Sequence, residues 1–386
     1  MSPFSLLQAG RATSQGLLSR PLARYLASKA PTPKTGVLLM NLGGPKDEKE
    51  VFSFLHRLFS DPDLIPLPFQ SRIAPWIARR RTPQIVEQYN AIGGGSPILD
   101  WTRRQGQALE KRMDVLAPES APHKVYIGMR YAKPLTEEAV EEMVQDGVER
   151  AVAFTQYPQY SCSTTGSSLN ELRRQLETHD PERRIRWSIL DRWADDTGLL
   201  KAVSKRITQA LQTYPEEERD SVVLLFSAHS LPMSVVNRGD PYPAEVADTV
   251  AGVMRMLGRK NPYRLVWQSQ VGPSAWLGAQ TSDAIKGYGK QGIRNLLVVP
   301  IAFTSDHIET LYELDLEYGH VAKEAGVTGY KRVESLNDMP EFIEGMASLL
   351  KGHLASGMKS TGKQLSLQCP SCEKDVCRMT KNYFEQ

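Results

Sequence analysis

One stretch of the sequence decides the fold: Val298-Val-Pro-Ile-Ala-Phe-Thr-Ser-Asp-His-Ile-Glu-Thr-Leu-Tyr-Glu313. It begins as an apolar run, which is typical of an inner strand of a parallel sheet, and continues directly into a helical pattern. The junction carries Asp306, His307 and Glu309, and Glu313 follows one helical turn later. In open α/β sheets, ligands bind just beyond the carboxyl ends of such strands. The stretch therefore predicts a functional site at the end of a buried strand.

A second stretch has the same arrangement. The segment Val222-Val-Leu-Leu-Phe-Ser-Ala-His-Ser-Leu-Pro232 ends its apolar run at His229. Two strands that each bring a histidine to the same kind of edge indicate one site for a metal or a proton. A neutral imidazole accepts a proton near physiological pH, and it also ligates ferrous iron. Both functions therefore stay open for His229.

Short apolar runs alternate with longer helical patterns along the chain, which indicates βαβ units and parallel sheets. The predicted strands fall into two groups of four: 37–42, 125–129, 151–155 and 185–190, followed by 222–227, 265–268, 296–302 and 329–333. The predicted fold is α/β, with two similar Rossmann-like domains that face each other across a cleft. Each domain has a four-stranded parallel sheet flanked by helices. We place the domains at 36–198 and 199–354.

The distribution of charge separates the first residues from the rest. The 386 residues carry a formal net charge of +3, but five basic residues precede Gly36 and the first acidic residue is Asp47. Without those five, 42 basic residues stand against 44 acidic ones, a net charge of −2 that gives no indication of nucleic-acid binding. The acid-free start, rich in Arg, Ser and Leu, predicts a mitochondrial transit peptide over residues 1–35. Because no run of eighteen apolar residues is present, no transmembrane helix is expected.

Two segments depart from the alternation of strands and helices. Residues 64–81 are apolar and Pro-rich and end in three arginines, and Pro66 and Pro68 keep the first part from forming a long helix. The segment is either a loop that covers the core or an exposed apolar lip for lipid head groups, and Trp76 with the arginines favours the lip. The last long helix is expected over 340–353. Residues 355–363 are interpreted as a polar linker, within a final region at 355–386.

The cysteines form an independent pattern. There are four of them, Cys162, Cys369, Cys372 and Cys377, and the last three have the spacing C-x2-C-x4-C. Three clustered thiols and one remote thiol suit four-cysteine ligation of zinc or of an iron–sulfur cluster. A reducing compartment argues against structural disulfides. The spacing alone leaves zinc and the cluster open.

Several strings of this chain resemble the ferrochelatase family, and together they cover nearly the whole chain from Gly36 onward. They are Asn41-Leu-Gly-Gly-Pro45, Arg81-Thr-Pro83, Gly93-Gly-Gly-Ser-Pro97, Gly128-Met-Arg-Tyr131, Gln156-Tyr-Pro-Gln-Tyr-Ser-Cys-Ser-Thr-Thr-Gly166, Ser227-Ala-His-Ser-Leu-Pro232, Gln268-Ser-Gln-Val-Gly272 and Ser305-Asp-His-Ile-Glu-Thr-Leu311. Ferrochelatases are lyases that insert ferrous iron into protoporphyrin IX and release two protons, the terminal step of haem biosynthesis. The resemblance implies this activity and the chelatase fold of two Rossmann-like domains.

The resemblance implies that His229 and Glu309 handle the protons of the macrocycle or ligate the substrate iron, Fe2+. His307, Asp306 and Glu313 are further catalytic candidates. Asp306, Glu309, Glu313 and Glu317 recur at helical spacing, and such an acidic stripe is either a solvated face or a path for a divalent cation or for protons. The position of the matching helix in ferrochelatases favours the path.

A flat tetrapyrrole needs apolar walls and a few polar groups for its propionates. Candidate walls are Leu42, Tyr131, Trp276 and Phe303. Arg81, Tyr89 and Ser96 match family positions that contact the macrocycle or its propionates. Arg130 follows a predicted strand and is expected to orient the macrocycle or to support its pocket.

The resemblance also implies a cofactor and partners. All four cysteines match positions that hold a [2Fe–2S] cluster in animal ferrochelatases, which favours the cluster over zinc. We further expect a homodimer on the matrix side of the inner mitochondrial membrane, bound peripherally, with porphyrin passing the lip. Two other functions stay open: a non-catalytic carrier of haem or metal, and a cobalt or nickel chelatase for a more polar tetrapyrrole. The apolar lip and the mitochondrial start argue against the second.

Overall fold

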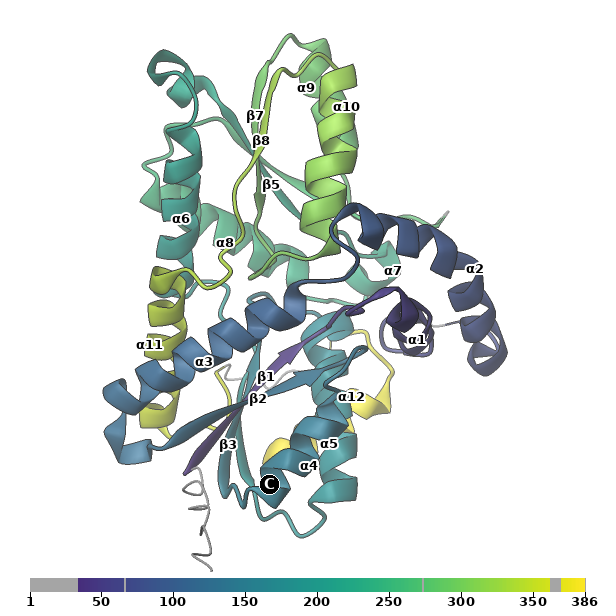
Figure 1. Ribbon diagram of the computed structural model, residues 1–386, viewed down its shortest axis with the longest axis vertical. Coiled ribbons are helices and arrows are strands. Elements are labelled where there is room, and N and C mark those ends of the chain that lie inside the picture. Colours follow the sequence, from purple (N-terminus) through teal and green to yellow (C-terminus); the bar gives the residue numbers. More distant parts are fainter. Residues whose placement is uncertain (1–33, 66, 273, 362–368, 386) are drawn as a thin grey trace, which may run out of the picture. The chain divides into compact units, whose positions relative to one another are not determined.

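Two four-stranded parallel sheets organise the protein (Figure 1). The computed structural model describes residues 34–65, 67–272, 274–361 and 369–385. The strand order is β2-β1-β3-β4 in one sheet and β6-β5-β7-β8 in the other, so the first strand of each group lies between the second and the third. The strands are β1 Thr35–Asn41, β2 His123–Met129, β3 Arg150–Thr155, β4 Arg186–Leu190, β5 Val223–His229, β6 Tyr263–Gln268, β7 Asn295–Pro300 and β8 Gly329–Arg332. The predicted α/β class with two four-stranded parallel sheets is confirmed.

All eight predicted strands are present, and their ends differ from the prediction by one or two residues. Strand β1 is buried along its whole length, as expected for an inner parallel strand. It begins two residues earlier than predicted because Thr35 and Gly36 pair with His123 and Lys124, the polar start of β2. Strand β5 extends to His229, which pairs with Gln268 of β6. Backbone pairing therefore continues past the apolar side chains that identify a strand in the sequence.

Helices cover both faces of each sheet, as the four buried hydrophobic clusters show. The α-helices are α1 Glu48–Phe59, α2 Gln70–Ala91, α3 Ile98–Leu116, α4 Thr136–Gln145, α5 Ser167–His179, α6 Thr197–Leu211, α7 Met233–Val236, α8 Tyr242–Met256, α9 Thr281–Lys290, α10 Tyr318–Glu324, α11 Pro340–Ser356 and α12 Asp375–Glu385. The short 3-10 helices are η1 Pro118–Ser120 and η3 Glu216–Ser221, and the π-helices are η2 Cys162–Gly166 and η4 Glu309–Glu317. None of the helices in the described ranges is long and apolar enough to cross a membrane.

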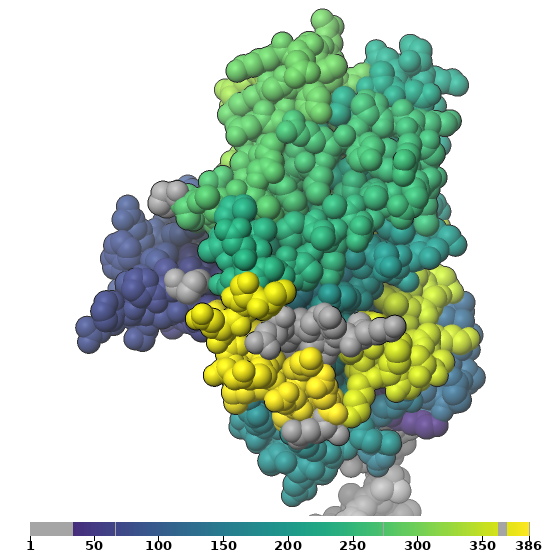
Figure 2. Space-filling model, turned by 180° about the vertical axis from the view of Figure 1, so that it is seen from behind, coloured from purple at the N-terminus to yellow at the C-terminus, as the bar shows by residue number. Residues whose placement is uncertain are grey.

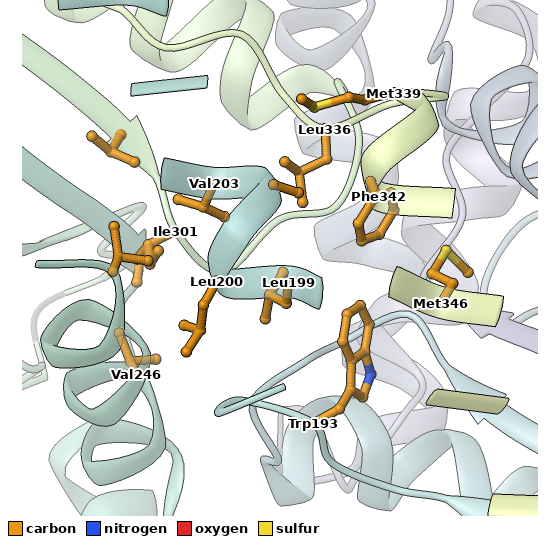
Figure 3. Close-up of a cluster of buried hydrophobic side chains, with 14 of the residues drawn as sticks. Trp193, Leu199, Leu200, Val203, Val246, Ile301, Leu336, Met339, Phe342 and Met346 are labelled. Carbon is orange, nitrogen blue, oxygen red and sulfur yellow. The ribbon is translucent and has the colours of Figure 1, made fainter. Parts of the chain in front are cut away.

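The largest hydrophobic cluster contains side chains from both halves of the chain. It joins Val37 and Leu39 of β1 to Leu224 and Phe226 of β5. Figure 3 shows a part of it where Trp193, Leu199 and Phe342 lie together. Helix α11 packs against both α3 and α6, so it links the two halves. The buried core therefore continues through the boundary predicted near residue 198, and the division into domains stays a prediction.

A close approach of helices α6 and α11 explains two glycines. A Cβ atom on Gly198 would lie 2.4 Å from the Cα of Gly345, far inside any van der Waals contact. Only a residue without a side chain fits at this crossing. The crossing brings the last long helix against the segment that leads from the first half to the second.

Helix α2 was missed by the sequence analysis, which assigned residues 64–81 to a loop or lip. The non-helical start at the early prolines is as expected, but a helix of 22 residues begins at Gln70 and contains Pro75 and Pro83. A proline inside a helix removes a hydrogen bond and costs about 3 kcal/mol or more. Packing offsets this cost, since Ala74, Ala78 and Tyr89 are buried against α1. Tertiary contacts that the local sequence does not show thus decide this element.

The segment expected to be a linker after the last long helix pairs with the first sheet. The backbone N–H of Ile189 in β4 donates to the carbonyl oxygen of Lys359 over 2.8 Å, and Thr361 returns a bond of 3.1 Å to Ile189. Residues 362–368, which include the last two residues of the predicted linker, lie outside the described residues, as do residues 1–33 of the predicted transit peptide. Figure 2 shows the C-terminal segment in yellow on the surface. There, α12 packs on α5, and Ser371 donates to the carbonyl of Arg238 in the second half.

Candidate active site

His229 ends strand β5, and its ring orientation is set by the main chain. The Nδ1 atom lies 2.6 Å from the carbonyl oxygen of Ser230. A carbonyl only accepts hydrogen bonds, so this contact assigns the proton of the neutral ring to Nδ1 and leaves the lone pair on Nε2. The ring is half-buried, and its centroid lies 6.4 Å from that of Trp276. The contact with the Ser230 carbonyl therefore leaves Nε2 as the ring nitrogen of His229 that can accept a proton or ligate a metal.

His307 and Glu309 follow strand β7 and lie beside His229. The His307 Nδ1 contacts the carbonyl oxygen of Ser305 at 3.2 Å, and its Nε2 lies 4.0 Å from a carboxylate oxygen of Glu309. Burial lowers the pKa of His307 and outweighs the raising effect of Glu309, and the proximity of His229 lowers that pKa further. The ring of Phe303 lies 4.6 Å from that of His307, centroid to centroid. The two histidines and the carboxylate, predicted from two separate stretches, thus come together at the carboxyl ends of adjacent strands.

The acidic stripe lies on a π-helix and not on the α-helix that the sequence predicted. Element η4 has nine residues, and π-helical segments are rare and concentrate at functional sites. Leu314 and Tyr318 are buried in the hydrophobic cluster that packs on β5 and β7 of the second sheet. The glutamates therefore lie on another face of the helix. Burial and the neighbouring Glu313 raise the pKa of Glu317. The row Glu309, Glu313 and Glu317 therefore runs from the histidines toward the exposed end of the helix.

Glu313 is held by four donors. Its Oε1 accepts from the Ser269 main-chain N–H at 2.8 Å and from the Tyr318 hydroxyl at 2.7 Å. Its Oε2 accepts from the Ser269 hydroxyl at 2.5 Å and from the Gln268 amide at 3.1 Å. Gln268 is the last residue of β6 and Ser269 follows it directly. The end of this strand therefore fixes the position of Glu313, the middle residue of the acidic row.

Asp306 is turned away from this row. One carboxylate oxygen accepts from Arg332 at 3.0 Å, Ser335 at 2.8 Å and Thr310 at 3.0 Å, and the other accepts from Asn337 at 2.8 Å. Burial disfavours the charged form, but Arg332 and these hydrogen bonds outweigh it and lower the pKa of Asp306. A carboxylate that is already paired on both oxygens anchors the start of η4. In the sequence, Asp306 is indistinguishable from the other catalytic candidates, because the pairing of its carboxylate with Arg332 depends on the fold.

Tyr89 reaches the same region from the end of helix α2. It is buried in a cluster with Leu42, Ile92 and Ile308, and burial together with Glu309 raises the pKa of its hydroxyl. Ser96 lies beside it, because a Cβ atom on Gly44 would meet the Ser96 Oγ at 2.5 Å and the Tyr89 hydroxyl at 3.5 Å. The strand end at Leu42 and the turn at Ser96 thus bring three of the predicted substrate-binding residues together.

Arg130 and Tyr131 occupy a buried polar network instead of a wall. The Tyr131 side chain has no exposed surface, and its hydroxyl donates to Asp61 Oδ2 over 2.6 Å. Arg130 donates to the same oxygen at 3.0 Å and to the Ser167 hydroxyl at 2.9 Å. The assignment of Tyr131 as an apolar wall is therefore corrected, because a buried hydroxyl must find a partner and here it finds Asp61. For Arg130 the arrangement favours the supporting alternative.

The predicted lip carries the most exposed aromatic side chains of the described residues. Phe69, just before α2, is 80% exposed and Trp76 in α2 is 59% exposed. Arg80 lies over the Trp76 ring at 5.6 Å, and Arg72 and Arg79 are exposed nearby on the same helix. Arg81 is half-buried in α2, two turns before Tyr89. Aromatic rings and arginines on one exposed helix are typical of a surface that contacts lipid.

Comparison with known proteins identifies the family. The ferrochelatase family model matches residues 34–354. The mitochondrial ferrochelatases of Xenopus laevis and Homo sapiens are each 57% identical over 353 residues, 91% of this chain and 86% and 83% of theirs. The chain belongs to the ferrochelatase family. The mitochondrial ferrochelatase of Schizosaccharomyces pombe is 48% identical over 365 residues, covering 94% of this chain and 85% of that protein.

The ferrochelatase fold is shared with a distant solved structure. SirB from Bacillus subtilis with Fe3+ matches with a TM-score of 0.50 and 12% identity, over 84% of this chain and 98% of that chain. At this identity the likeness concerns the fold alone. The family predicted from the sequence strings is confirmed, as are the activity of a protoporphyrin ferrochelatase that inserts iron and its place in haem synthesis.

The four cysteines of this ferrochelatase lie in one region of the structure, although their spacing in the sequence does not identify the metal. The Cys369 thiol raises the pKa of Cys162, and the same interaction lowers the pKa of Cys369. Burial raises the pKa of Cys377 to about 11, with contributions from Cys372 and Cys369. These interactions link Cys162 to Cys369, and Cys377 to Cys369 and Cys372. The fold therefore brings the remote thiol into the region of the tail thiols.

The surroundings of the thiols fit an iron–sulfur group. The buried Tyr160 hydroxyl has no hydrogen-bond partner among the described residues, and burial and the neighbouring thiols raise its pKa. Such an orphaned donor is satisfied if a sulfur anion binds beside it. Asn170 and Arg238 each lie 3.7 Å from a cysteine sulfur, those of Cys377 and Cys162. Gly239 leaves room for the tail, because a Cβ atom there would lie 2.7 Å from Pro370.

The spacing of the sulfurs differs from that of a mononuclear zinc site. With Zn–S bonds of about 2.3 Å, tetrahedral geometry puts the sulfurs about 3.8 Å apart. Within the described ranges, no three of the cysteine sulfurs lie within 4.8 Å of one another, and the group that does meet this criterion is Glu137, Glu141 and His179 on α4 and α5.

Three functional contributors were missed in the sequence. They are Ser269, Arg332 and Asp61, whose side chains bind site residues without lining the site themselves. No sequence motif identifies any of the three. Ser269 lies inside one of the strings that carry the family resemblance and directly after a predicted strand, which was the available signal. Arg332 and Asp61 could not be found, since their partners lie 26 and 69 residues away in the chain.

Proposed function

We propose that His229 takes protons from the pyrrole nitrogens of protoporphyrin IX while ferrous iron, the substrate, enters the ring. The observation that carries this proposal is the bond from the His229 Nδ1 to the Ser230 carbonyl, which leaves Nε2 free to accept a proton. A positioned general base contributes about 10²–10⁴-fold to the rate. The adjacent His307 and Glu309 accept the proton that His229 releases. Glu309 is also suited to ligate the iron.

The row of glutamates on η4 is proposed to serve as the path for charge. Glu309 lies near the histidines, Glu313 follows, and the exposed Glu317 ends the row. Burial and the neighbouring Glu313 raise the pKa of Glu317, so the outer end of the row can hold a proton. Protons leave along this row, or iron arrives by it. Asp306 acts through its anchoring of η4 and not as an acid or base.

For the macrocycle we propose walls from Leu42, Trp276 and Phe303, with Tyr89, Ser96 and Arg81 near its propionates. The support for this proposal is that Tyr89 and Leu42 share a cluster next to Glu309, while Phe303 and Trp276 flank the two histidines. Walls that hold the ring in a bent form expose its nitrogen lone pairs and favour the transition state. Arg130 and Tyr131 support this region from the buried network around Asp61.

The four cysteines are proposed to hold a [2Fe–2S] cluster. Cys162, Cys369, Cys372 and Cys377 would ligate it, with Tyr160, Asn170 and Arg238 around the sulfurs. When bound, such a cluster cross-links the tail to the body and can carry one electron.

We also propose that the domains divide at 36–198, 199–354 and 355–386, with the tail near a homodimer interface. The exposed Met358 and Met379 support an interface there.

We further propose a mitochondrial protein bound peripherally to the matrix side of the inner membrane. The acid-free start and the mitochondrial ferrochelatases of several species support the compartment. The exposed aromatic rings and arginines of α2 support the membrane contact, through which porphyrin would arrive.

The membrane contact predicts a defined result. Replacing both Phe69→Ser and Trp76→Ser should lower binding to vesicles of phosphatidylcholine and cardiolipin about 100-fold, since each buried aromatic contributes about 1.5–3 kcal/mol. Vesicle flotation measures the binding. The control carries Val115→Ser and Met256→Ser, two exposed apolar side chains outside α2, and should bind like the parent. Equal binding by the two double variants would remove the lip from the membrane contact.

The substrate is tested by competition between porphyrins. With ferrous iron under anaerobic conditions, we expect kcat/KM for protoporphyrin IX to exceed that for coproporphyrin or sirohydrochlorin at least about 100-fold. Each extra carboxylate that must be buried without a partner costs more than about 1.4 kcal/mol, a factor of ten. Absorption spectroscopy of the metallated products measures the rates. Preference for sirohydrochlorin would support the cobalt or nickel chelatase, and tight haem binding without any turnover would support the carrier.

A further inference from the structure

Ser269 has an uncommon backbone conformation at the end of β6. Its φ angle is +65°, in the left-handed region that residues other than glycine rarely adopt. Such strain persists where the surrounding structure requires it, and it concentrates at functional sites. In this conformation both the main-chain N–H and the side chain of Ser269 reach helix η4. The strained residue is therefore a direct link between β6 and the acidic row.

One hydroxyl of Ser269 contacts two carboxylates. Its Oγ lies 2.5 Å from Glu313 Oε2 and 3.3 Å from Glu309 Oε2. A serine hydroxyl has a single proton, and ionised carboxylates only accept hydrogen bonds. The proton can therefore serve one glutamate at a time, and the shorter contact assigns it to Glu313. The contact with Glu309 is complete only when Glu309 itself carries a proton and donates it.

We propose that Ser269 is a positioning residue that also passes a proton from Glu309 to Glu313. The step is balanced: the proton of Glu309 moves to the Ser269 Oγ as the proton of that hydroxyl moves to Glu313 Oε2. Rotation of the hydroxyl and release of the proton from Glu313 to water, beside Glu317, restore the starting state. No electron moves and no further reactant is needed. The proposal rests on the proposed roles of Glu309 and Glu313 in removing protons from the macrocycle.

Two substitutions separate the hydroxyl from the backbone conformation. Ser269→Ala removes the hydroxyl and keeps the main-chain bond to Glu313. Ser269→Gly removes the hydroxyl and also relieves the strain of the left-handed conformation. If the residue mattered only for the shape of the chain, Ser269→Gly would behave like the parent.

We expect Ser269→Ala and Ser269→Gly to lower kcat about 10–100-fold, within the range of a single proton-transfer group. The KM for ferrous iron should change less than about threefold, and kcat should become more sensitive to heavy water because proton transfer becomes slower. The matched control is Ser234→Ala, an exposed serine of α7, which should resemble the parent in every measurement.

Glu309→Gln is measured alongside, so that failure of the two proposals can be told apart. If Glu309→Gln is inactive while Ser269→Ala has normal kcat and a normal solvent isotope effect, the acidic row stands and the role of Ser269 is overturned. If Ser269→Gly is as active as the parent, Ser269 has only a conformational role. If Glu309→Gln is fully active, the role of the acidic row itself fails. Thermal unfolding of each variant confirms that the compared proteins are folded.

Discussion

His229→Ala is expected to lower the rate of iron insertion by about 10²–10⁴-fold, the contribution of one general base. The bond from Nδ1 to the Ser230 carbonyl holds the imidazole so that Nε2 can accept a proton, whereas the Nε2 of His307 already lies 4.0 Å from a carboxylate oxygen of Glu309. Alanine removes the acceptor of the pyrrole proton and leaves the strand end in place. Haem formation from protoporphyrin IX and ferrous iron, followed anaerobically by absorption, measures the loss.

The control for this variant is His320→Ala, because His320 is 70% exposed on α10 and pairs with Glu324 at the surface. It should turn over like the parent. His229→Gln serves as a second variant that fills more of the original volume, and it should be as slow as His229→Ala. Turnover by His229→Ala equal to that of the parent would keep the enzyme but remove His229 from proton transfer.

Cys162→Ser is expected to abolish the visible absorption of the [2Fe–2S] cluster in the purified protein. Cys162 is the ligand that the body contributes beside the three tail thiols, so its loss leaves the cluster with three of its four ligands. Loss of a bound metal group is among the few changes that destabilise a protein severely. We expect the free energy of unfolding to fall by more than about 3 kcal/mol. Absorption spectra, iron content and thermal unfolding measure these effects.

The matched control is Asn382→Ser, which changes an exposed side chain of the same tail helix and should keep the cluster. A parent protein that contains zinc and no iron or sulfide would keep the four-thiol site and contradict the cluster. Retention of the full visible spectrum by Cys162→Ser would show that Cys162 is not a ligand. Proteolysis adds an independent readout, because the tail of Cys162→Ser should be cut faster between α11 and α12.

The sequence by itself determined the α/β class, because inner parallel strands need apolar runs, and runs such as 151–154, 222–226 and 296–299 alternate with helical patterns. It also determined which strand ends carry the chemistry, since parallel strands deliver their carboxyl ends to one edge of a sheet. His229 and His307 could therefore be assigned to one site from local patterns. The cysteine spacing likewise indicated a four-thiol site, although it left the metal open.

Only the tertiary structure decided what each polar side chain faces. Asp306 lies in the same acidic stripe as Glu309 in the sequence, but Arg332 turns it into an anchor. Tyr131 is as apolar as a wall residue in pattern, but its hydroxyl is bound by Asp61, which lies 70 residues away. The partners of a buried polar group come from distant parts of the chain, so local sequence cannot identify them.

Tertiary packing also decided two elements against local propensity. Helix α2 forms in spite of Pro75 and Pro83 because one of its faces is buried against α1. The acidic helix η4 is a π-helix, whose wider turn is not encoded in the spacing of its glutamates. Nothing in the local sequence distinguishes Ser269, which binds this helix, as a residue with a left-handed backbone conformation. Its conformation becomes visible only where β6 ends against η4, since the two carboxylates that it binds are supplied by the fold.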